Sequence, residues 1–376
     1  MADNNTIKTT NQTSQTSQTS QTGQTSPTGQ TSQTGPTGPT GPTGQTAKTT
    51  NSAPAATAST PLKGKTASSL LIGNLCMLFA AIFWGLNVSV TKALYEPVAW
   101  MTPHSIVVVR LVGGAILFWI ASAFIKCESI EKEDWLKVVL GGFVGLFGFI
   151  FLFIQSLEFG SAIDISIIMT LPPIFVILIG VIFLKRRPGW LEYLGVAVSF
   201  IGAAIVILGG ADDSHVSKHN PHPILGDMLA IASTICYAFY LTILEGPTKK
   251  YKPVALLRWI FLFSAIPALF LLKDFDKLPL FHDAPALPWI YISFILICPT
   301  FIAYFLVQPA IKRIGSELVS IYQYLLPVFA TISAIFMIQE KLHWIQVIAM
   351  VVIVIGMCFT TFGKRKRVKK EGQDDV

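Results

Sequence analysis

Residues 156–207 read SLEFGSAIDISIIMTLPPIFVILIGVIFLKRRPGWLEYLGVAVSFIGAAIVI, and residues 310–357 read AIKRIGSELVSIYQYLLPVFATISAIFMIQEKLHWIQVIAMVVIVIGM. The two segments carry glycines and prolines in the same order, 154 or 155 positions apart. The matches are Gly160-Ser161 with Gly315-Ser316, Pro172 with Pro327, and Gly202 with Gly356. Upstream of each segment an arginine also recurs, Arg110 in VVRLV and Arg258 in LLRWI. This shared order predicts two tandem copies of one structural unit.

The whole chain is more apolar than a water-soluble protein. Its mean hydropathy is +0.58, and only 13% of its residues are charged. A soluble domain carries roughly 25% charged residues, which it needs to cover a water-facing surface. Lipid is therefore the expected solvent for most of this chain.

Ten apolar segments follow the first 65 residues. Each is near the roughly 20 residues that a helix needs to cross a hydrocarbon core of about 30 Å. We place them at 71–93, 104–125, 136–157, 165–184, 191–209, 224–244, 254–272, 288–309, 318–339 and 344–362. The sequence thus predicts an all-α integral membrane protein with ten transmembrane helices.

The positive charges predict how these helices are oriented. A net charge of +7 would suggest a nucleic-acid partner in a soluble protein, but here the basic residues lie in short clusters between apolar segments. If the N-terminus is cytoplasmic, nineteen Lys and Arg residues fall in segments expected inside and four in segments expected outside. This bias follows the positive-inside rule, so we expect both termini in the cytoplasm and no nucleic-acid partner.

Each predicted repeat holds five spans, an odd number, so the second copy must sit upside down relative to the first. The predicted units are a first five-helix repeat at 70–209 and a second at 224–362. Inverted repeats are the architecture of many secondary transporters, because two halves of opposite asymmetry can open one central site to each side in turn.

The two ends of the chain differ from the repeats. Residues 1–65 are a low-complexity tail of Thr, Gln, Ser, Gly and Pro, predicted to be disordered. The first apolar run lies too deep for a cleaved signal peptide and is expected to remain as a helix. Residues 363–376 form a predicted basic cytoplasmic tail. The five cysteines include no C-x-x-C pair and are expected to be small buried hydrophobes.

Over residues 70–362 the chain resembles the EamA branch of the drug/metabolite transporter superfamily. The two quoted segments are similar to its repeated signature, and residues 74–94, NLCMLFAAIFWGLNVSVTKAL, are similar to its opening helix. Arg110 and Arg258 fall where the family carries an arginine in the second helix of each repeat. Glu340-Lys341-Leu342 matches its acidic-basic-Leu element, from which the first half departs with Lys185-Arg186-Arg187.

The resemblance implies ten helices, cytoplasmic termini and a central cavity lined mainly by the first, third, fourth, sixth, eighth and ninth helices. It also implies transport, often efflux, of amino acids or other small metabolites. A bacterial inner membrane is the expected location, because the resemblance is closest to bacterial members.

Polar and aromatic side chains inside apolar segments are the expected lining of that cavity, because an unpaired amide in hydrocarbon is costly. Trp84 and Asn87 lie mid-way along the first segment, and Tyr237 and Tyr240 lie 153 residues later. The full set of candidates is Trp84, Asn87, Arg110, Gln155, Tyr237, Tyr240, Tyr304, Gln308 and Tyr322. Aromatic packing and interhelical hydrogen bonding are the alternatives.

Arg110 is the candidate to bind a substrate carboxylate, because a lipid-exposed charge at mid-depth costs about 3 kcal/mol or more. Arg258 lies near the cytoplasmic end and is expected to reach the interface. Pro172, Pro173 and Pro327 are predicted inside the fourth and ninth helices, as hinges or as static kinks. All acidic residues fall near segment ends, so no buried carboxylate for proton coupling is predicted. These acids are Asp164, Asp227, Glu245, Glu317 and Glu340.

The leading hypothesis is therefore a secondary transporter that exports a small polar metabolite such as an amino acid, and not an enzyme. The sequence contains no Walker A motif, so transport driven by ATP hydrolysis in this chain is disfavoured. An intramembrane enzyme acting on lipid, a channel and a non-transporting scaffold are the alternatives. The expected partners are a small-molecule substrate and membrane lipid, with a homodimer left open. We predict neither a cofactor nor a metal site.

Overall fold

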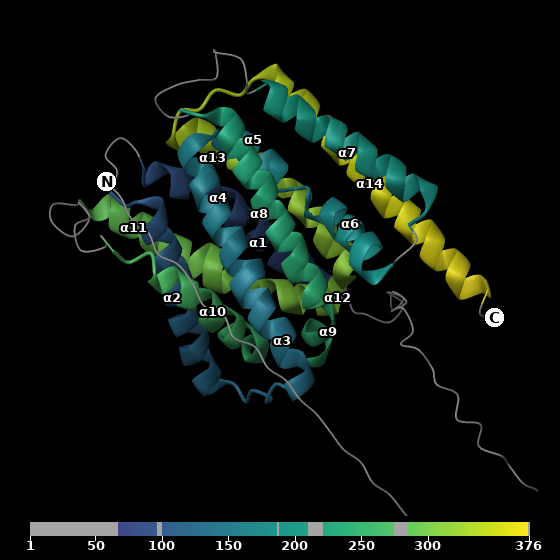
Figure 1. Ribbon diagram of the computed structural model, residues 1–376, viewed down its shortest axis with the longest axis horizontal. Helices are drawn as coiled ribbons and strands as arrows, with labels where there is room; N and C mark the ends of the chain where they lie inside the picture. Colours follow the sequence, from purple (N-terminus) through teal and green to yellow (C-terminus); the bar gives the residue numbers. More distant parts are fainter. Residues whose placement is uncertain (1–66, 96–99, 186–187, 210–220, 274–284, 375–376) are drawn as a thin grey trace, which may run out of the picture. The chain divides into compact units, whose positions relative to one another are not determined.

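The computed structural model describes residues 67–95, 100–185, 188–209, 221–273 and 285–374. Every regular element in these ranges is helical (Figure 1). The segment 1–65, predicted to be disordered, lies outside the described residues.

The helices fall into two series. The first is α1 (Ala67–Ala93), α2 (Pro103–Phe124), α3 (Lys132–Leu140), η1 (Gly141–Leu146), α4 (Phe147–Phe159), α5 (Ala162–Ile168), α6 (Pro172–Leu184) and α7 (Trp190–Gly209). The second is α8 (Pro223–Ile243), α9 (Glu245–Lys250), α10 (Pro253–Leu269), α11 (Ala286–Ile295), η4 (Leu296–Ile302), α12 (Ala303–Tyr322), η5 (Gln323–Leu325), α13 (Leu326–Met337) and α14 (Trp344–Asp374).

Eight helical runs in the described part of the chain are long and apolar enough to cross a membrane. They are Ser68–Ala93, Pro103–Phe124, Lys132–Phe159, Ala162–Ile182, Trp190–Gly209, Pro223–Ile243, Ala286–Val307 and Trp344–Gly363. Two shorter apolar helices, Pro253–Leu269 and Leu326–Met337, lie where the seventh and ninth spans are predicted. The chain is therefore a multi-pass membrane protein.

The surface of the helices carries large apolar side chains. Phe124 is 85% exposed, Phe336 is 82% exposed and Leu208 is 73% exposed. Water would penalise so many exposed apolar groups, whereas hydrocarbon accommodates them. This surface is the one that a lipid-embedded protein presents.

Irregular features recur at matching places in the two series. A π-helical segment interrupts the third run of the first series at η1 and its counterpart in the second at η4. In each series the next-to-last helix ends near a residue with positive φ, which is Lys185 at 50° in the first series and Gln339 at 54° in the second. The last helices begin at Trp190 and Trp344, again 154 residues apart. Local geometry thus follows the sequence repeat.

The three predicted hinge prolines begin helices and do not lie inside continuous ones, which corrects the prediction. In the predicted fourth span, α5 ends at Ile168 and α6 begins with Pro172 and Pro173. In the ninth, η5 precedes α13, whose second residue is Pro327. Proline lacks an N–H and fits the first turn of a helix, so each proline begins the second half of an interrupted span.

Two helices continue beyond the predicted apolar spans. Helix α12 continues to Tyr322, through the predicted loop between 309 and 318. Helix α14 continues to Asp374, through most of the predicted basic tail. Both polar stretches lack proline and contain Lys, Arg and Glu, which favour helix once one has begun. The cysteines are free and half-buried, and not fully buried as predicted.

The two series pack against each other along their length. Helix α1 contacts α12 and α13, α2 contacts α10, α4 contacts α8, and α7 contacts α14. Figure 1 shows α7 and α14 running side by side. At that contact an added Cβ on Gly202 would lie 3.0 Å from the Ile353 nitrogen and 3.1 Å from the Ala349 oxygen. Glycine lets the two backbones approach this closely, as in many membrane helix pairs.

Candidate solute-binding site

A cavity of about 60 Å³ lies among helices of both series. This volume holds a few water molecules. The walls come from α1, α2, α4 and the α5–α6 connection, and from α8, α12 and α13. The lining residues are Trp84, Asn87, Val88, Arg110, Phe149, Phe153, Met169, Tyr237, Tyr304 and Leu326.

Arg110 is the charged residue in this lining. Its side chain is 3% exposed, and its Nε donates to Thr300 Oγ1 at 3.0 Å. Its Cζ lies 6.0 Å from the ring centroid of Phe153, within the range of a cation–π contact. One terminal nitrogen, Nη1, has no hydrogen-bond partner among the described residues. A buried guanidinium in this state is suited to pair with an anionic group that enters the cavity.

Thr300 positions Arg110 through the irregular segment η4. Its Oγ1 donates to the carbonyl of Ile295, five residues earlier, at 2.8 Å. The adjacent carbonyl of Pro299 accepts a hydrogen bond from Trp84 Nε1 at 3.2 Å. The π-helical turn therefore holds two cavity residues from the first series, Trp84 and Arg110.

Aromatic rings form the rest of the wall. Tyr304 meets Trp84 edge-on at 6.0 Å between centroids, and Tyr237 lies 4.6 Å from Phe149. Asn87 is 3% exposed, and its Oδ1 accepts from Thr91 at 3.4 Å. The cavity thus combines a cation and an amide with aromatic surfaces, a combination suited to a small polar solute with an apolar part.

Five predicted candidates meet at this cavity: Trp84, Asn87, Arg110, Tyr237 and Tyr304. Tyr240, Gln155 and Tyr322 do not line it. Tyr240 stacks on Tyr237 at 5.8 Å, Gln155 lies in α4 with a buried oxygen that has no partner among the described residues, and Tyr322 packs near Met77. The Gln308 side chain lies outside the described residues.

Sequence reasoning missed Thr300, Phe149 and Phe153. Pro299 next to Thr300 inside an apolar run was the available signal, because proline frees a backbone carbonyl and distorts the helix. The phenylalanines gave none, since α4 is rich in that residue throughout. Met169 and Leu326 place both helix interruptions against the cavity.

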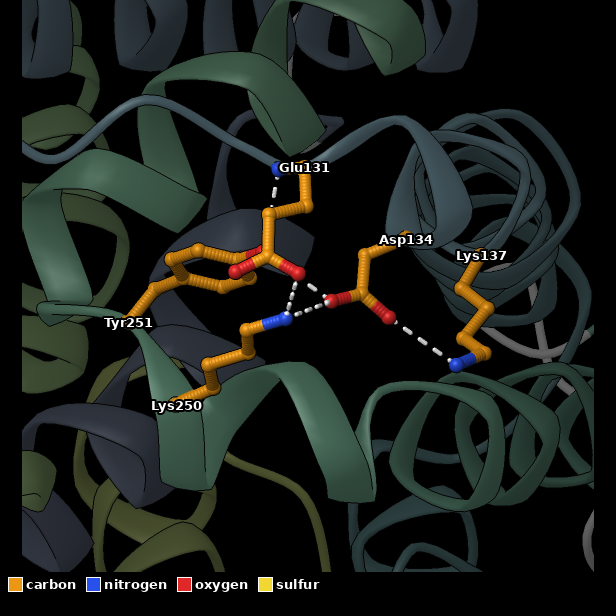
Figure 2. Close-up of polar contacts among 5 residues, drawn as sticks. All are labelled: Glu131, Asp134, Lys137, Lys250 and Tyr251. Atoms are coloured by element: carbon orange, nitrogen blue, oxygen red, sulfur yellow. Dashed lines mark hydrogen bonds and ion pairs between the residues drawn. The ribbon is translucent and has the colours of Figure 1, made fainter. Parts of the chain in front are cut away.

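At one end of the helices, charged residues join the two series in a group that we call the Lys250 network (Figure 2). Lys250 pairs with Glu131 and, at 3.2 Å, with Asp134. Tyr251 donates to Asp134 Oδ2 at 3.0 Å and accepts from the Glu131 nitrogen at 3.0 Å, while Lys137 pairs with Asp134 at 2.9 Å. The Glu131 hydrogen bond raises the pKa of Lys250 above its ordinary value, so this lysine stays charged.

The Lys250 network is partly exposed to solvent. Lys250 is 42% exposed and Glu131 is 58% exposed, whereas the Asp134 side chain is 9% exposed. Solvent screens the pair between Lys250 and Glu131, so this pair holds the two series together more weakly than a buried one would.

At the other end a buried group, the Lys92 cluster, consists of Lys92, Asp164, Asp227, Glu340 and Gln346. Lys92 is 2% exposed. Its Nζ donates to the carbonyl of Gly160 and interacts electrostatically with Glu340 and Asp164. Gln346 Nε2 donates to Asp164 Oδ1 at 2.8 Å. Both Glu340 oxygens accept from the Ala162 nitrogen at 3.1 Å. The last two contacts again join the two series.

The prediction that no carboxylate is buried was wrong. Asp164 is 2% exposed and Asp227 is 0% exposed. Both lie near helix ends, but at this end the start of α8 packs closely on the α4–α5 connection. An added Cβ on Gly160 would lie 3.1 Å from the Gly226 Cα. Packing of one series on the other therefore covers positions that the sequence places near the water.

The network, the cavity and the cluster follow each other along one helical run. Asp134 lies near the start of Lys132–Phe159, Phe149 and Phe153 lie beyond its middle, and Ala162 lies just past its end. The cavity therefore lies between two different contacts of the series, one exposed and one buried.

Known proteins that are similar to this chain are named as transporters. The family model described as "EamA-like transporter family" matches residues 71–208 and 224–362. The "Uncharacterized transporter YyaM" of Bacillus subtilis is 25% identical over 75% of this chain and 90% of its own length. An "Uncharacterized transporter" of Archaeoglobus fulgidus is 27% identical over 61% of this chain and 77% of its own. One crystal structure, 19% identical, superposes with a TM-score of 0.53 over 80% of this chain and 99% of its own.

Proposed function

The chain belongs to the EamA-like transporter family, and from that premise we propose that it is a secondary carrier for a small polar metabolite with a carboxylate, such as an amino acid. The observation that carries this proposal is Arg110, buried in the cavity with Nη1 unpartnered among the described residues. A bidentate carboxylate satisfies a guanidinium in both charge and geometry. The aromatic wall then contacts the rest of the solute.

In this proposal the two repeats are inverted and each crosses the membrane five times, with α10 and the interrupted α13 region as the short spans. Both termini lie in the cytoplasm of a bacterial cell, as the positive-inside rule favours. The Lys250 network then faces the cytoplasm, and the Lys92 cluster faces the opposite side. Breaking one contact while the other holds opens the cavity to one side at a time, which is alternating access.

The interruptions before Pro172 and Pro327 are the proposed hinges. Each lacks continuous helical hydrogen bonding, and Met169 and Leu326 beside them line the cavity. A change of angle there alters the cavity shape without disrupting whole helices. The direction we propose is export, driven by an ion or solute gradient, without a catalytic step.

The test is counterflow in proteoliposomes that contain the purified full-length protein and an unlabelled pool of amino acids and small organic acids. We expect saturable uptake of labelled members of the pool, competed by carboxylates and not by the corresponding decarboxylated amines. Arg110→Gln should weaken apparent affinity about tenfold or more, because a hydrogen bond to a charged group contributes about 1.5–3 kcal/mol.

Arg258→Gln is the matched control. Arg258 is the repeat counterpart of Arg110, but its Cζ lies over the rings of Trp119 and Trp259 at 5.4 and 5.6 Å, away from the cavity lining. If both variants lower affinity equally with folding intact, the cavity is not the solute site. Equal competition by amines would remove the carboxylate from the proposal.

A further inference from the structure

Asp227 in α8 is a buried acid whose neighbours do not neutralise it. It is 0% exposed, and neither carboxylate oxygen has a hydrogen-bond partner among the described residues. It lies beyond the first turn of α8, so the free N–H groups at the start of the helix do not reach it. A carboxylate anion in this state loses its hydration without compensation, whereas a protonated acid does not.

The surroundings make the anion still less favourable. The charged residue that acts on Asp227 is Asp164 of α5, a second acid. Among the elements packed on α8, Glu158 lies on α4, while α6 and η1 contain no titratable residue. Helix α9 follows the opposite end of α8, the titratable residues of α3 and α7 lie toward the starts of those helices, and His222 immediately precedes α8.

Charge counting across the Lys92 cluster gives the same result. One ammonium, Lys92, faces three carboxylates, Asp164, Asp227 and Glu340, so the fully ionised cluster has a net charge of 1 − 3 = −2. Lys92 interacts with Glu340 and Asp164, and those two also accept from Ala162 and Gln346. A proton on Asp227 changes the net charge of the cluster from −2 to −1 and removes the repulsion between Asp227 and Asp164.

We propose that Asp227 is a proton-binding site of this protein, which exchanges its proton when the two repeats separate at the Lys92 cluster. The proposal rests on the carrier function proposed above and names a regulator of it, the proton concentration on the side of the Lys92 cluster. With the cluster closed, Asp227 is a neutral acid. When the Gln346–Asp164 and Glu340–Ala162 contacts break, water reaches Asp227, its O–H bond breaks and the proton passes to that water. Closing the cluster again requires Asp227 to take up a proton.

The effect of pH follows from the position of the cluster. Its two contacts join the repeats, so opening on that side and release of the proton are one event. The pH on that side of the membrane therefore biases the equilibrium between the two open states. The proton returns from the side to which it was released, so it regulates the carrier and does not itself drive solute movement.

Infrared spectroscopy of the full-length protein in lipid tests the site without a known substrate. We expect a carbonyl band of a protonated carboxylic acid at neutral pH, weaker in Asp227→Asn than in the wild type and unchanged in Glu192→Gln. Glu192 is the matched control, because it is 2% exposed but accepts from the Gly189 nitrogen at 3.1 Å. Raising the pH should lower the thermal stability of the wild type more than that of Asp227→Asn, because the folded wild type holds a proton on Asp227 that the unfolded chain releases.

The flux assay tests the effect of pH. Raising the pH on the side of the Lys92 cluster should change the rate of counterflow of the labelled amino-acid pool by the wild type and by Glu192→Gln, because loss of the Asp227 proton favours the state open on that side. Asp227→Asn should lose this response. A carboxylic-acid band of undiminished intensity in Asp227→Asn, or a pH response of that variant equal to that of the wild type, would overturn the proposal. If the Asp227 band is present but the wild type moves no solute, the proton site stands and the carrier function fails.

Discussion

At the residue scale, the cavity combines one cation with aromatic rings, and its binding properties depend on how that cation is held. Among the described residues, Arg110 donates to Thr300 Oγ1 and contacts the ring of Phe153. These contacts fix the guanidinium without neutralising it. Its Nη1, which has no partner among those residues, is therefore available to a ligand, and a pre-positioned donor loses little conformational entropy on binding.

Replacing Thr300 by valine should weaken solute binding although Thr300 is absent from the cavity lining. Valine keeps the shape but removes the acceptor for Arg110 Nε, which then has to reorient. We expect the apparent affinity in counterflow to fall about tenfold, as for the loss of one hydrogen bond to a charged group. Thr234→Val is the control, because Thr234 bonds only within α8, to the Ala230 carbonyl at 2.7 Å. Equal effects of the two changes would count against positioning by Thr300.

Residue chemistry alone predicted part of this site. Trp84, Asn87 and Arg110 stand out because each is costly in lipid, and the repeat then pointed to Tyr237. Threonine is common in membrane helices, so Thr300 gave no comparable signal. The buried state of Asp164 and Asp227 was missed for another reason: burial at a helix end depends on which element covers that end, and the local sequence does not contain this information.

At the element scale, interrupted helices distinguish this molecule from a simple bundle. Proline placement predicted where the fourth and ninth spans are interrupted. Each span consists of separate helical elements that meet there, and not of one kinked helix. The π-helical turns η1 and η4 were not predicted, because one extra residue per turn leaves the apolar pattern almost unchanged. These turns occur in equivalent runs, so they belong to the repeated unit.

The contact between α7 and α14 should be intolerant of a single methyl group. Gly202→Ala would place Cβ within about 3 Å of backbone atoms of α14, and overpacking of this kind costs about 1–3 kcal/mol. Gly246→Ala in α9 meets nothing within 4 Å and gains helix propensity of about 1 kcal/mol. Thermal unfolding in detergent should therefore shift down for Gly202→Ala and not for Gly246→Ala. Equal shifts would mean that the helices separate at no cost.

At the scale of the whole molecule, the sequence repeat, the charge bias and the apolar runs predicted a multi-pass membrane protein of two repeats, and the family match confirms it. Helix lengths were harder to predict, because polar residues that follow a span without a proline continue the helix. The inverted orientation and the cytoplasmic termini remain predictions.

The central claim is that this cavity is reached from both faces of the membrane in turn. Leu326→Cys, in a background with the five native cysteines replaced, puts a reactive thiol in the cavity lining without changing its polar groups. An impermeant maleimide applied to either face of oriented vesicles should label it. Asp134→Asn, which weakens the Lys250 network, should speed labelling from the cytoplasmic face and slow it from the other. Labelling from one face only, unchanged by Asp134→Asn, would contradict alternating access.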